Sequence, residues 1–154
     1  MLQQYKRILV AVDGSEEAEL AFKKAVHVAN RNESALLLLH VIDTRAFQSV
    51  SSFDGAMAEQ ATEQAKNTME EYVKYAKKHD VQDVSYTIEY GSPKALIAKQ
   101  IPEEKKVDLI MVGATGLNAV ERIFIGSVSE YVIRQAPCDV LVVRTDLENK
   151  IPQK

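Results

Sequence analysis

The chain has 154 residues and a formal net charge of −3, with 19 basic and 22 acidic residues intermixed along the sequence. No basic stripe favours nucleic acid, and apolar runs such as 35–39 are far too short to span a bilayer. The lone Cys138 excludes an internal disulfide framework. We therefore expect one cytoplasmic domain over residues 1–154, with its core in 5–144 and a loose polar tail in 145–154.

The first part of the chain predicts a strand, a helix and a second strand. Residues 7–12 predict a buried strand, because Arg7 is followed by five apolar residues in a row. Asp13-Gly14-Ser15 then supplies a turn and a helix cap, and residues 15–31 carry an apolar stripe at helical spacing. Residues 35–42 are apolar except for His40 and predict the second strand.

The middle of the chain continues this alternation after a loop. Residues 43–53 have no hydrophobic period, whereas 54–79 predict a long helix whose core stripe includes Met57 and Met69. Residues 84–90 alternate between apolar and polar positions and predict a strand. Ser92-Pro93 is a cap followed by a first-position proline, and predicts a short helix that ends at residue 101.

The last third of the chain completes the pattern. Residues 107–112 predict a buried strand, 127–135 a helix that ends before Pro137, and 139–144 a final strand. Buried strands that alternate with helices pair in parallel through right-handed crossovers, which place helices on both faces of the sheet. The sequence therefore predicts a doubly wound α/β sandwich with five parallel strands.

A glycine-rich segment follows the predicted strand 107–112. Gly113 and Gly116 come first, and Gly126-Ser127 then opens the predicted helix 127–135. Ser127 and Glu130 fit an S-x-x-E capping box, which places the first turn of that helix. Glycines allow close approach to the main chain, and a helix N-terminus offers free N–H groups with a favourable dipole. The arrangement predicts an anion site.

The spacing Gly113-x2-Gly116-x9-Gly126-Ser127 resembles the nucleotide-binding signature of the universal stress protein family, in its ATP-binding branch. The segments KRILVAVDGSEEAELAF, LLLLHVID and APCDVLVVR are similar to the family too, and the resemblance covers residues 5–144. It implies the strand order 3-2-1-4-5. Ligands of such sheets bind where the strand order reverses, which here is between the ends of the first and fourth strands.

The resemblance also implies the ligand and its contacts: ATP, or AMP or ADP, with Mg²⁺ carried by the triphosphate. Asp13 would bind a ribose hydroxyl or the base edge, with a simple cap of the first helix as the alternative, and Val41 would meet adenine through its main chain. Arg122 would face the phosphates or form a solvated pair with Glu121. The predicted nucleotide-binding residues are Ala11, Val12, Asp13, Val41, Val112, Gly113, Thr115, Gly116, Asn118, Gly126, Ser127, Val128 and Ser129.

Three functions compete at this point. The first is an ATP-binding regulator that works as a homodimer through strand 139–144, with a protein partner that the sequence does not name, and with no nucleic acid or membrane as partner. No Walker lysine, catalytic triad or metal-ligand cluster is recognisable, so we expect slow hydrolysis at most and no structural metal. The second is a dimeric scaffold with a vestigial pocket, because the neutral Thr115 stands where many relatives carry a basic or larger polar residue. The third is an adenylyl-transfer or pyrophosphatase enzyme, which Glu16 and Glu17 disfavour by repelling phosphate.

Overall fold

Five parallel strands form one sheet in the computed structural model, which describes residues 4–44, 55–114 and 125–152. The order β3-β2-β1-β4-β5 confirms the predicted doubly wound topology. The strands are β1 (Arg7–Ala11), β2 (Ala35–Asp43), β3 (Val84–Gly91), β4 (Leu109–Gly113) and β5 (Asp139–Val143). In the described part of the chain, no helix has the length and apolar character needed to cross a membrane.

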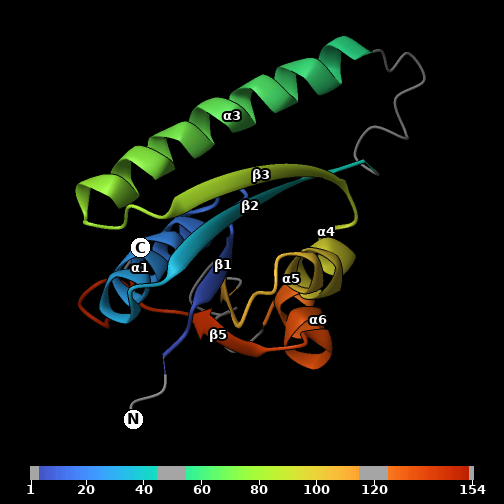
Figure 1. Ribbon diagram of the computed structural model, residues 1–154. Coiled ribbons are helices and arrows are strands. Elements are labelled where there is room, and N and C mark those ends of the chain that lie inside the picture. The colour runs from blue at the N-terminus through green and yellow to red at the C-terminus, as the bar shows by residue number, and fades with distance from the viewer. Residues whose placement is uncertain (1–3, 45–54, 115–124, 153–154) are drawn as a thin grey trace.

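Helices cover both faces of the sheet, as expected for right-handed crossovers (Figure 1). The first face carries α1 (Glu16–Asn32) and α3 (Gly55–Lys78), with Phe22 stacked on Tyr72 at 4.4 Å between ring centroids. The second face carries α4 (Pro93–Ala95), η1 (Leu96–Gln100), α5 (Ile101–Glu104) and α6 (Ser127–Gln135). Two apolar cores result, one between each helical layer and the sheet.

The long helix α3 differs from its prediction at its N-terminal end. Met69 is buried as expected, but Met57 is 42% exposed, so its assignment to the core is wrong. The reason is length, because 24 helical residues reach about 36 Å whereas the eight residues of β3 span about 26 Å. Figure 1 shows the first turns of α3 extending past the end of the sheet.

The helical segment after β3 begins as predicted but continues past residue 101. Pro93 is its first residue after the N-cap Ser92, and the helical path runs through a π turn to Glu104. In this turn the N–H of Ile101 bonds to the carbonyl of Leu96, five residues earlier. Pro102 has no N–H to donate, and a widened turn accommodates its ring without ending the helix. The predicted end at residue 101 is therefore wrong.

The start of α6 also differs from the sequence prediction. Gly126 is the N-cap, Ser127 is the first helical residue, and no side chain caps the helix. Glu130 is thus the fourth residue of the helix and lies beyond reach of the cap, and its carboxylate instead receives a 2.6 Å hydrogen bond from Arg134. The predicted capping box does not form, so the Ser127 hydroxyl and the first N–H groups of α6 are left for other partners.

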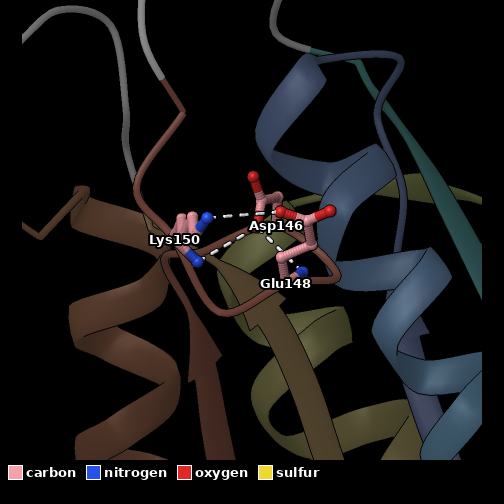
Figure 2. A network of polar contacts seen from close by, with 3 residues as sticks. All are labelled: Asp146, Glu148 and Lys150. Atoms are coloured by element: carbon pink, nitrogen blue, oxygen red, sulfur yellow. Dashed lines mark hydrogen bonds and ion pairs between the residues drawn. The ribbon is translucent and has the colours of Figure 1, made fainter.

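Sequence analysis predicts a loose tail after β5, yet this segment contains a hydrogen-bonded turn. The Asp146 carboxylate accepts the N–H groups of Glu148 at 2.9 Å and Lys150 at 3.0 Å (Figure 2). The turn is also tied to α1, because Lys24 Nζ donates to Thr145 Oγ1 at 2.5 Å and to Asn149 Oδ1 at 3.0 Å. Local side-chain acceptors therefore organise a tail that lacks an apolar pattern.

Candidate functional site

A cavity of about 380 Å³ lies at the carboxyl ends of β1 and β4, where the strand order reverses. This is the position at which doubly wound sheets hold their ligands, and the volume is within the usual range for small-molecule sites. Every predicted site residue in the described part of the chain lines it: Ala11, Val12, Asp13, Val41, Val112, Gly113, Gly126, Ser127, Val128 and Ser129. Thr115, Gly116 and Asn118, like Glu121 and Arg122, lie outside the described residues.

Part of the cavity lining is apolar. Leu39 and Val41 of β2 face it from the sheet, and Pro93 and Ile97 approach it from the helical segment after β3. Sequence analysis missed Leu39, Pro93 and Ile97 as site residues, because each fits a strand or helix pattern that is fully explained by the core. A planar aromatic group such as a nucleobase would suit this apolar part of the lining, because a flat ring gains most from apolar contact.

Asp13 lies two residues after the end of β1 and lines the cavity. Its Oδ1 accepts the N–H of Ser15 at 2.9 Å, and this local turn also uses Gly14 at φ +88°. Ser15, not Asp13, caps α1, because its hydroxyl accepts the N–H of Ala18 at 3.1 Å. The simple-cap alternative for Asp13 is therefore wrong, and among the described contacts its second carboxylate oxygen has no partner.

The first turn of α6 also lines the cavity. Ser127, Val128 and Ser129 are its first three residues, so their N–H groups have no partner within the helix. The Ser129 hydroxyl, only 6% exposed, donates to the carbonyl of Gly113 at 2.9 Å and so holds α6 against the end of β4. Backbone donors, the Ser127 hydroxyl and the positive end of the helix dipole therefore share one wall, which suits an anionic group.

Gly113 has a packing role that the sequence does not reveal. A Cβ at this position would lie 2.6 Å from the backbone oxygen of Glu17, in α1. The sequence interpretation gives Gly113 a role in close approach of the ligand, whereas the structure shows that α1 already occupies the space of a side chain. The glycine is thus required for α1 to pack across the end of β4.

The hydrogen bond of His40 and the burial of Cys138 indicate a structural role for each residue. The Nδ1 of His40 lies 2.9 Å from the carbonyl of Val12, and it must carry the proton because a carbonyl only accepts. This hydrogen bond fixes the main chain at Val12, which lines the cavity. Cys138 is half-buried, and burial raises the pKa of its thiol to about 11, which disfavours the reactive thiolate. Across residues 4–44, 55–114 and 125–152 we find no group of three or more potential metal-ligating side chains.

The fold and cavity together define a doubly wound α/β protein with a cavity at its topological switch point. The sequence model of the universal stress protein family matches residues 4–144. Proteins named as putative universal stress proteins in Staphylococcus haemolyticus and Staphylococcus aureus are each 49% identical over 142 residues, which cover 92% of this chain and 86% of theirs. The chain therefore belongs to the universal stress protein family.

Solved structures agree with this assignment. UspA from Lactobacillus plantarum is 34% identical, superposes with a TM-score of 0.81, and is matched over its full length by 93% of this chain. A universal stress protein in complex with cAMP is 23% identical and has a TM-score of 0.71, covering 92% of this chain and 98% of its own. A protein from Archaeoglobus fulgidus in complex with dAMP is 22% identical with a TM-score of 0.63, covering 91% and 98%. Because the last two proteins are less than 25% identical to this chain, their similarity shows only that the fold is shared.

Proposed function

We propose that this protein is a cytoplasmic stress-response regulator that binds an adenine nucleotide, such as ATP, ADP or AMP, in the cavity between β1 and β4. The observation that carries the proposal is that apolar side chains and a helix N-terminus line one cavity. The apolar part of the lining suits the base, Asp13 suits the ribose and the first turn of α6 suits the phosphates. Proteins of this fold in complex with cAMP and dAMP support the choice of ligand.

A binding role fits the chemistry of the walls better than efficient catalysis. The charged residues in the described lining are Asp13 and Glu17, both acidic. Fast phosphoryl transfer needs cationic groups that offset the charge developing on the phosphates. We therefore propose slow ATP hydrolysis or none, with nucleotide occupancy acting as the signal that changes the shape of the protein or its choice of partner.

The first test is to ask what the purified protein carries. The protein is denatured immediately after purification, and the released small molecules are separated by ion exchange and identified by mass. An adenine nucleotide near one per chain is the expected result. An empty protein that also gives no heat on titration with Mg-ATP would refute the proposal and favour a scaffold with a vestigial pocket.

Replacing Asp13 by alanine is expected to weaken adenine nucleotide binding by about tenfold, because one hydrogen bond from a ribose hydroxyl to a carboxylate is lost. Asp13→Asn is the matched control, since its amide oxygen can still accept the Ser15 N–H and hold the turn. Calorimetric titration gives both affinities, and thermal unfolding checks the fold. If both variants bind as tightly as the unmodified protein, Asp13 does not contact the ligand.

We also propose that the protein forms a homodimer through β5. This strand lies at an edge of the sheet, and Leu141 at its centre is 42% exposed. Apolar edge strands tend to be covered or paired, and pairing with a second copy would satisfy both the backbone and the side chains. Leu141→Lys is expected to yield monomers by light scattering at concentrations where the unmodified protein is dimeric. A concentration-independent monomer for the unmodified protein would contradict the dimer.

A further inference from the structure

Glu17 occupies an unexpected place for an acidic residue in a nucleotide site. It is the second residue of α1, is half-buried, and lines the cavity. Its Cβ lies 3.0 Å, and its backbone oxygen 2.6 Å, from the position that a Cβ on Gly113 would take. The carbonyl of Gly113 in turn accepts a hydrogen bond from the hydroxyl of Ser129, in the first turn of α6. Glu17 is therefore held against the end of β4, and it lines the same cavity as the first turn of α6.

The ion pairs of α1 and α6 do not include Glu17. The Lys23 ammonium lies 3.4 Å from the Glu19 carboxylate, and the Arg134 guanidinium lies 2.6 Å from the Glu130 carboxylate, so these two cations have other partners. Glu17 itself forms no ion pair with any described residue. Within the described residues, a carboxylate without an ion-pair partner thus lines the same cavity as the first turn of α6, and it opposes the binding of the negative charge that the helix dipole favours.

We propose that Glu17 selects the ligand of this cavity by its charge. Without divalent cations, the site takes adenosine or a nucleoside monophosphate in preference to ATP, because repulsion by Glu17 grows with each phosphate charge. Mg²⁺ on the triphosphate removes most of this penalty and restores ATP binding. The carboxylates of Asp13 and Glu17 are oxygen donors of the kind that Mg²⁺ prefers, so they fit a ligand that brings this ion with it.

This inference rests on the nucleotide-binding role proposed above, and it adds the ligand charge class and its dependence on divalent cations. The experiment is calorimetric titration of nucleotide-free protein with adenosine, AMP and ATP, each in EDTA and in Mg²⁺. The variants are Glu17→Gln and, as a matched control, Glu16→Gln. Glu16 precedes Glu17 in α1, is exposed, and does not line the cavity.

In EDTA, Glu17→Gln is expected to raise the affinity for ATP about tenfold and for AMP about threefold, as the Coulomb energy scales with ligand charge at moderate ionic strength. Adenosine binding should stay unchanged, because the nucleoside carries no charge. Mg²⁺ should reduce the gain for ATP to that for AMP or less. Glu16→Gln should produce a clearly smaller gain for ATP and for AMP in EDTA, and no change for adenosine.

Other outcomes would overturn the inference in distinguishable ways. If Glu17→Gln changes ATP, AMP and adenosine binding by the same factor, Glu17 acts on the shape of the cavity and not through charge. A second outcome is that the unmodified protein binds ATP and AMP, but the ratio of the ATP affinity to the AMP affinity is the same in Glu17→Gln and Glu16→Gln. Selection by Glu17 then fails, while the proposed nucleotide binding stands. If none of the three ligands binds to the unmodified protein, both proposals fail.

Discussion

Replacing Gly113 by alanine is expected to lower the free energy of unfolding by about 3 kcal/mol, the upper range for overpacking a close contact. The added Cβ would lie 2.6 Å from the Glu17 carbonyl oxygen, which is a backbone atom and cannot rotate away. The whole start of α1 would have to retreat from β4. Thermal unfolding should show a melting temperature lower by roughly 10 °C for a chain of this length.

An alanine substitution at a second glycine distinguishes this steric clash from the general effect of adding a methyl group. Gly55, the first residue of α3, has open space around it, because a Cβ added there would meet no heavy atom within 4 Å. Gly55→Ala should therefore change stability by less than about 0.5 kcal/mol. Nucleotide binding gives a second readout, because retreat of α1 would also move Glu17 in the cavity wall. Equal stability of the two alanine variants would show that α1 adjusts easily at Gly113.

Gly126→Val is expected to weaken adenine nucleotide binding by about tenfold or more, equivalent to at least about 1.4 kcal/mol. Gly126 is the N-cap of α6, and a side chain at an N-cap lies over the N–H groups of the second and third helical residues, here Val128 and Ser129. Valine would cover these donors with methyl groups. Since Gly126 has φ −60° and ψ 156°, an extended conformation open to any residue, the chain itself is not strained.

Gly126→Ser is the companion variant, because it should change stability in the opposite direction to Gly126→Val. Serine is a favourable N-cap and should stabilise α6, whereas valine should destabilise it. Both side chains nevertheless obstruct the same N–H groups, serine by hydrogen bonding to them, so both variants should bind ATP more weakly in calorimetric titration. Unchanged affinity in both variants would mean that the first turn of α6 does not hold the phosphates.

Some features of the site are predictable because they belong to short stretches of sequence. Gly126 and Ser127 mark a helix N-terminus after a buried strand, and Asp13 ends the first apolar run. The exact cap is not predictable in the same way. Ser127 and Glu130 fit a capping box, but α6 begins after Gly126, and Ser129 turns its hydroxyl to Gly113. A contact with a residue distant in sequence therefore decides which local hydrogen bonds form.

Hydrophobic periodicity was enough to predict the alternation of strands and helices, and with it the parallel sheet covered on both faces, because this signal depends on near neighbours in the chain. Only the folded arrangement shows which apolar residues become walls of a cavity, such as Leu39 and Ile97 from separate elements. It also brings Glu17 into the same cavity as the first turn of α6 and makes Gly113 a packing requirement. These features arise where elements cross, and short-range sequence patterns carry no record of which residues meet there.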